Sequence, residues 1–142
     1  MKFSHDKPPM LDLILQRGME PDLNRTCYTF GDVLYIPEKI QPEQLPPEFI
    51  AHEETHTKQQ GNDPQKWWNR YLLDQYFRIE QEAEACAVQY LFFKHRVNHD
   101  RNAGARFLFQ LAGQLAGPTY GRVVNQVAAQ RMIQQYAGKL RI

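Results

Sequence analysis

The sequence predicts a mainly helical α+β fold, built as one domain with a short N-terminal β-hairpin followed by about five helices. The 142 residues suit a single domain, and 42% of them are hydrophobic, which is enough to form a core. One stretch rich in β-branched and aromatic residues precedes several stretches whose apolar residues recur every three to four positions. We expect the domain to span residues 1–142, with its core at about 26–136.

The expected hairpin consists of residues 26–30 and 33–36. Both stretches are rich in β-branched and aromatic side chains, and the Gly-Asp pair between them suits a two-residue turn. Pro37 ends the second strand because it lacks the N–H that a ladder requires. Residues 1–25 are expected to be irregular apart from a short amphipathic stretch at 11–16.

Five later stretches are expected to be helical, because their apolar residues recur at helical spacing and prolines or glycines mark their ends. Turns should separate them near residue 74, at 98–102 and at the Gly-Pro pair at 117–118. The approximate helical ranges are 48–60, 62–74, 77–97, 105–115 and 120–136.

Composition excludes a membrane-spanning or disulfide-stabilised protein. The longest apolar runs have four residues, whereas a membrane helix needs about 20. The N-terminal residues do not match a signal peptide, and the two cysteines, Cys27 and Cys86, form no C-x-x-C motif. We therefore expect a cytoplasmic protein with reduced thiols and no membrane partner.

The net charge of +1 conceals an asymmetry along the chain. Residues 1–100 carry all 16 acidic residues and a net charge of −5, whereas residues 101–142 carry six Lys or Arg and a net charge of +6. Basic segments can bind nucleic acid, but these six residues are widely spaced and lack interleaved aromatic residues. We interpret them as a solvated face or as partners of the acidic part of the domain, so nucleic acid is not an expected partner.

The most specific signal is the H-E-x-x-H motif at residues 52–56, inside the expected helix 48–60. His52 and His56 are four residues apart, so one helix face can direct both imidazoles at a single metal ion. Glu53 lies about 100° around the helix, where its carboxylate can reach water instead of the metal. Zinc prefers a third protein ligand and a water at the fourth position, so we expect Zn²⁺ and a further His or carboxylate from a following element.

The next long helix carries E-x-E-A patterns at 80–83 and 82–85. An H-E-x-x-H helix followed by such a helix resembles the gluzincin group of zinc metallopeptidases in a minimal single-domain form. The chain also resembles small metallopeptidase-like proteins of phages and prophages, over roughly residues 26–135. The stretches that carry this second resemblance are 67–71, 77–78 and 116–121.

The resemblance implies a zincin-like fold and hydrolysis of peptide bonds in a peptide or protein substrate, with Glu53 as the general base. It also implies the host cytoplasm or the virion as the location if the protein is phage-encoded. Spacing alone leaves both Glu82 and Glu80 as candidates for the third ligand. The run 82–89 matches the phage-type sequences more closely, which favours Glu82 as the metal ligand; with Glu80 instead, Glu84 would support a ligating histidine.

Two residues depart from the family pattern. Glu54 stands where zincins usually have an uncharged residue, and Cys86 stands where many relatives have Asp. Cys86 also suggests the alternative function, a non-catalytic zinc-stabilised structural or binding module in which a fourth protein ligand closes the metal site. A further alternative is a phage accessory protein that docks on nucleic acid or a virion component through its basic C-terminal part.

Several other residues have alternative interpretations. His95 and His99 also lie four residues apart, but no acidic residue stands between them as in the motif, and a helix C-terminus, where cationic side chains are favoured, explains them better than a metal does. Tyr120 can donate to an oxyanion or pack in the core, and the tryptophans Trp67 and Trp68 are interpreted as core residues rather than a substrate wall. We also hypothesise that the second hairpin strand is an edge that aligns a peptide substrate.

Overall fold

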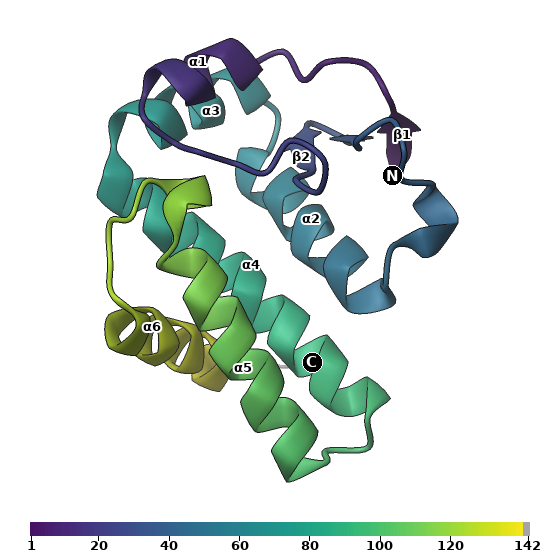
Figure 1. Ribbon diagram of the computed structural model, residues 1–142, viewed down its shortest axis with the longest axis vertical. Coiled ribbons are helices and arrows are strands. Elements are labelled where there is room, and N and C mark those ends of the chain that lie inside the picture. Colours follow the sequence, from purple (N-terminus) through teal and green to yellow (C-terminus); the bar gives the residue numbers. More distant parts are fainter. Residues whose placement is uncertain (141–142) are drawn as a thin grey trace.

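The computed structural model describes residues 1–140 and has a mainly helical α+β architecture with one small sheet (Figure 1). The hairpin and the five helices expected after it are confirmed. No helix within the described residues is long and apolar enough to cross a membrane. The elements are β1 (Lys2–Ser4), α1 (Leu11–Gln16), β2 (Tyr28–Phe30), β3 (Val33–Tyr35), η1 (Pro42–Gln44), α2 (Pro47–Gln60), α3 (Pro64–Leu73), α4 (Gln75–Arg96), α5 (Arg101–Leu115), η2 (Pro118–Tyr120) and α6 (Gln126–Lys139).

The sheet has the strand order β1-β3-β2, with β1 parallel and β2 antiparallel to β3. Gly31 takes a φ of +62° in the turn between β2 and β3, a conformation that glycine adopts without steric cost. The expectation that residues 1–25 are irregular was wrong at β1, whose three residues pair only through contacts distant in sequence. The hypothesis of a peptide-aligning edge at residues 33–36 was also wrong, because β3 is the central strand and is paired on both sides.

The helices that carry the H-E-x-x-H motif and its expected partner begin and end at recognisable signals. Pro47 occupies the first position of α2, where its missing N–H costs nothing, and α2 ends at Gly61, which has a φ of +59°. Asp74 accepts hydrogen bonds from the backbone N–H groups of Tyr76 and Phe77, which fixes the start of α4. The expected break near residue 74 is therefore confirmed.

The two C-terminal helices differ in their bounds from the expected ranges. Helix α5 begins at Arg101 rather than near 105, because the Asp100 side chain caps it by accepting from the N–H of Ala103. Helix α6 begins at Gln126 rather than near 120, because Asn125 provides its cap. It continues to Lys139, three residues beyond the expected end.

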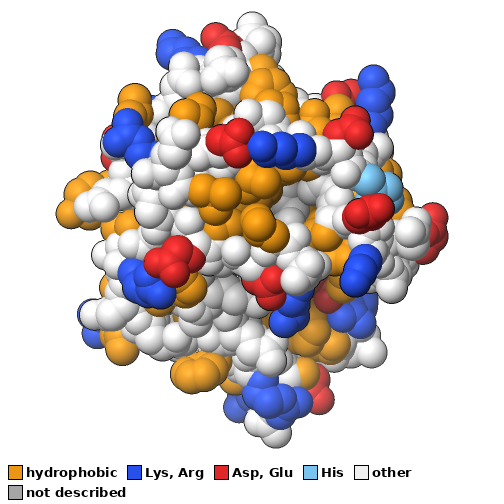
Figure 2. All heavy atoms as spheres, turned by 45° about the horizontal axis from the view of Figure 1, so that its top comes forward, with side chains coloured by type: hydrophobic (Ala, Val, Ile, Leu, Met, Phe, Trp, Pro, Cys, Tyr) orange, Lys and Arg blue, Asp and Glu red, His pale blue; other side chains and the backbone are white. Residues whose placement is uncertain are grey.

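Buried side chains form a core between α4, α5 and α6 and a second cluster around α3 and the N-terminal segment. Trp67 and Trp68 are only 6% and 3% exposed and pack in the second cluster beside Met10 and Ile14, so residues before the hairpin belong to the packed structure. Figure 2 shows the face toward the top of Figure 1, where hydrophobic side chains gather between acidic and basic ones. Among the C-terminal cations, Arg122 pairs with Glu20 at 2.9 Å.

Candidate metal centre

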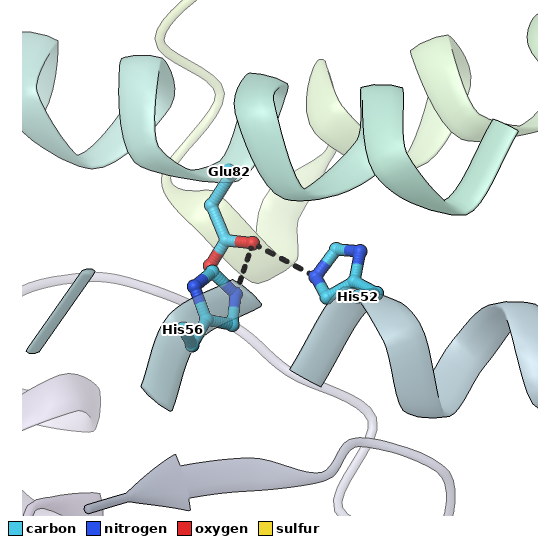
Figure 3. A group of neighbouring side chains, drawn as sticks. All are labelled: His52, His56 and Glu82. Carbon is cyan, nitrogen blue, oxygen red and sulfur yellow. Dashed lines mark hydrogen bonds and ion pairs between the residues drawn. The ribbon is translucent and has the colours of Figure 1, made fainter. Parts of the chain in front are cut away.

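Helices α2 and α4 bring three potential metal ligands together in the interior (Figure 3). One carboxylate oxygen of Glu82, Oε1, lies 3.3 Å from Nε2 of His52 and 3.0 Å from Nε2 of His56. All three residues are at most 6% exposed. The structure therefore contains a buried group of two imidazoles and one carboxylate that could hold a metal ion.

The donor atoms fit a tetrahedral site with one open position. Their mutual separations are at most 4.8 Å, and zinc bonds of about 2.0 Å at tetrahedral angles place neighbouring ligand atoms about 3.3 Å apart. Two His and one Glu is a ligand set used by catalytic zinc sites, which keep the fourth position for water. The distances from Glu82 to the two histidines are already close to this separation.

The second nitrogen of each histidine is held by a glutamine. Nδ1 of His52 lies 2.9 Å from Oε1 of Gln89, and Nδ1 of His56 lies 2.8 Å from Oε1 of Gln59. The amide nitrogen of Gln59 donates in turn to Glu84, which fixes Oε1 as the atom that faces His56. Nδ1–H of His56 therefore donates to Gln59, and Nε2 is the nitrogen directed at the ligand group.

The charges of the group favour a carboxylate paired with an imidazolium when no metal is bound. Burial alone would raise the pKa of Glu82, but the neighbouring imidazoles His56 and His52 hold it far below its usual range. Burial alone would lower the pKa of His56, but the Glu82 carboxylate raises it to about 9. The other Glu82 oxygen, Oε2, accepts a hydrogen bond of 2.6 Å from the Tyr71 hydroxyl. All these contacts orient Glu82 toward the motif histidines.

Glu53 lies beside the ligand group without belonging to it. Its Oε2 accepts a 2.6 Å hydrogen bond from the Thr29 hydroxyl on β2. Burial raises the pKa of Glu53, and this effect outweighs the lowering by the motif histidines and by Thr29. A buried carboxylate whose pKa is raised in this way is suited to accept and release a proton.

The ligands and Glu53 line a small, partly open cavity of about 20 Å³, which is large enough for a water molecule. Residues 26–29, which lead into and begin strand β2, line one part of this cavity, and Trp67 and Trp68 of α3 line another. Tyr120 from η2 also lines it, so this tyrosine lies at the site rather than only in the core.

The remaining residues singled out in the sequence lie outside the ligand group. Glu80 and Glu54 are exposed, and Glu84 approaches the site only through Gln59. Burial raises the pKa of the Cys86 thiol well above its usual value, and Cys86 is absent from the potential metal groups found among residues 1–140. His95 and His99 stack edge to face at 6.0 Å, and they too form no such group within those residues.

Sequence reasoning missed the residues that orient the ligands, namely Thr29, Gln59, Tyr71 and Gln89. A helical period carries a weak signal for two of them. Gln59 lies three residues after His56, and Gln89 lies seven residues, or two turns, after Glu82. Thr29 and Tyr71 come from other elements and approach the site only through tertiary packing.

Comparison with known proteins gives no match to a protein-family model, a curated protein or a solved structure. The interpretation of the centre therefore rests on its own geometry and chemistry.

Proposed function

We propose that the protein is a zinc-dependent hydrolase of peptide bonds, a metallopeptidase of the gluzincin type. The observation that carries this proposal is the arrangement of four buried residues around one cavity: His52, His56 and Glu82 as a ligand set, and Glu53 as a carboxylate outside that set. A purely structural metal site would not need the fourth of these groups.

In this proposal His52, His56 and Glu82 would hold a zinc ion, which would act as a Lewis acid and lower the pKa of the attacking water toward neutrality. Glu53 accepts the proton from the attacking water and delivers it to the leaving amine. The Thr29 hydroxyl fixes one Glu53 oxygen and leaves the other free for this transfer. Gln59 and Gln89 hold the imidazole rings at the angle that the ligand set requires.

The resemblance of the motif and of α4 to gluzincins supports a zincin-like fold for the domain. The second resemblance, carried by residues 67–71, 77–78 and 116–121, supports a phage-type protein that acts on a peptide or protein in the cytoplasm. Helix α2 with its motif and helix α4 with Glu82 follow each other in the order that the gluzincin resemblance implies.

A second candidate function is a zinc-stabilised structural or binding module. It is favoured by the burial of the centre, because the three ligand residues are at most 6% exposed and the cavity beside them has a volume of only about 20 Å³. Under the hydrolase proposal, a substrate must reach the ligand group through the open side of this cavity.

The two functions are separated by Glu53→Gln, which keeps the shape of the side chain but removes the base. Under the hydrolase proposal the variant retains one equivalent of zinc, and cleavage of a diverse peptide pool falls by about 10²–10⁴-fold. Exposed Glu54→Gln, one residue away, is the matched control and should cleave like the wild type. Undiminished cleavage by Glu53→Gln would contradict the assignment of the base, and zinc binding without cleavage by the wild type would favour the structural module.

A further inference from the structure

The Tyr28 hydroxyl is buried without a hydrogen-bond partner. Tyr28 is 8% exposed, and among the described residues its hydroxyl is the one buried side-chain polar atom that no group pairs with. Buried polar atoms are almost always paired, since an unpaired one costs about 1–3 kcal/mol. A buried hydroxyl that no group of the protein pairs with calls for a partner from outside the chain, such as a water molecule, an ion or a bound ligand.

The side chain of Tyr28 lies at the metal centre. Tyr28 lines the same small cavity as the three ligands and Glu53, and its ring packs edge to face on Trp68 at 6.0 Å. Burial and the nearby carboxylates of Glu82 and Glu53 raise the pKa of Tyr28 far above its usual value. The phenol therefore stays protonated and can only gain a partner by donating to an acceptor in the cavity or by accepting from a donor there.

Tyr28 also borders a second hollow. With Thr26 it lines both the cavity at the ligand group and a surface depression of about 260 Å³ between the N-terminal segment and residues 35–38. Tyr28 therefore lies where these two hollows adjoin.

We propose that the Tyr28 hydroxyl donates a hydrogen bond to the oxygen atom that occupies the cavity beside Glu53. This inference rests on the proposed hydrolase function and adds a residue that contacts the reacting oxygen. It makes β2 a second functional element, because Thr29 orients Glu53 and the adjacent Tyr28 holds the oxygen on which Glu53 acts. A donor fixed before the reaction stabilises an oxygen that gains negative charge without reorganisation.

The test uses the full-length protein loaded with Co²⁺ in place of zinc and measures the binding of azide from the visible spectrum. Azide is a small linear anion whose terminal nitrogen can take the place of the oxygen while its other atoms extend toward the open side of the cavity, so the assay does not depend on hydrolysis. Tyr28→Phe should bind Co²⁺ in the same ratio as the wild type but bind azide about tenfold more weakly, because a hydrogen bond to a charged group is lost. Tyr35→Phe is the matched control, since Tyr35 pairs with Tyr28 across the sheet but does not line the cavity. It should bind azide within twofold of the wild type.

Metal-free Tyr28→Phe should also melt at or above the wild-type temperature, because the deleted hydroxyl has no partner within residues 1–140. Azide binding by Tyr28→Phe within twofold of the wild type would overturn the inference, and so would a large loss of stability of the metal-free variant. If Tyr28→Phe weakens azide binding as expected but the wild type cleaves no peptide, the role of Tyr28 is supported and the hydrolase proposal is contradicted. The two failures are therefore distinguishable.

Discussion

Glu82 holds the ligand group together, since one of its oxygens faces both motif histidines and the other accepts from Tyr71. We expect Glu82→Ala to lose most of the bound zinc, because losing a ligand should cost at least the 10–100-fold in affinity that losing an orienting residue costs. Glu80→Ala, two residues away and exposed, should keep one equivalent. Metal analysis of the purified variants checks this. Loss of zinc by Glu80→Ala but not by Glu82→Ala would show that the third ligand lies on the exposed face of α4.

Zinc affinity should rise with pH through the titration of His56. Its pKa of about 9 in the metal-free protein means that zinc must displace a proton from this imidazole below pH 9. Glu82, whose pKa is lowered, is already ionised and adds no such dependence. Affinity should therefore increase about tenfold per pH unit between pH 7 and 8.5 and level off above pH 9.

The raised pKa of His56 also determines how the stability of the metal-free protein changes with pH. Because it lies above the unfolded value of about 6.5, the stability that His56 contributes is complete below pH 6.5 and is lost as the pH rises through about 9. Competition titrations with a chelator measure the affinity, and urea unfolding in EDTA measures the stability. An affinity independent of pH from 7 to 8.5 would contradict the charge assigned to His56.

At the residue scale, the sequence indicates the two histidines and Glu53 because the spacing of the motif has a direct geometric meaning on a helix. The choice between Glu82 and Glu80 depends on which face of α4 is buried. Residues Arg78, Ile79, Glu82 and Ala83 share that face, whereas Glu80 is exposed. The spacing of the glutamates did not distinguish the two, and the packing of this face of α4 against α2 does. The unpaired hydroxyl of Tyr28 has no counterpart in the pattern, because it follows from what surrounds the side chain.

At the scale of elements, side-chain caps determine where the helices begin, and the apolar period does not reveal these positions. Asp74, Asp100 and Asn125 are all typical N-cap residues. The start of α6 was placed six residues early because Val123 and Val124 continue the apolar pattern outside the helix. Strand β1 has three residues and no periodicity to detect, since its pairing with β3 bridges about 30 positions.

Asp74 is the cap that bears most directly on the candidate metal centre. It is the single residue between α3 and α4, and its side chain fixes the start of the helix that carries Glu82. We expect Asp74→Ala to lower the free energy of unfolding by about 1 kcal/mol, the usual cost of losing an N-cap side chain. Urea unfolding of the metal-free protein measures this. Asp100→Ala, which removes the cap of α5 away from the centre, should cost a similar amount. If Asp74→Ala lowers the free energy of unfolding and Asp100→Ala does not, Asp74 contributes more to stability than its N-cap hydrogen bonds.

At the scale of the whole molecule, the candidate metal centre lies between two parts of the chain. Helix α2 follows the sheet, and α4 forms a core with α5 and α6 (Figure 1). The ligand group connects α2 with α4 (Figure 3). A second link joins the same helices at their other ends, where Arg96 donates two hydrogen bonds to the buried Glu48. Burial alone would raise the pKa of Glu48, but Arg96 lowers it, so the pair is ionised. The α2–α4 interface is thus held by charge at two places.

Zinc should therefore stabilise the whole fold rather than a loop. A ligand that binds only the folded state stabilises it by about 2.7 kcal/mol when its free concentration is 100 times the dissociation constant. We expect one equivalent of zinc to raise the melting temperature and EDTA to reverse the shift. His52→Ala should melt at the same temperature with and without zinc, because one ligand from α2 is missing and the ion no longer joins α2 to α4. Superimposable melting curves of the wild type in zinc and in EDTA would contradict a metal centre at this interface. An equal zinc-induced shift in the variant would place the bound ion elsewhere on the protein.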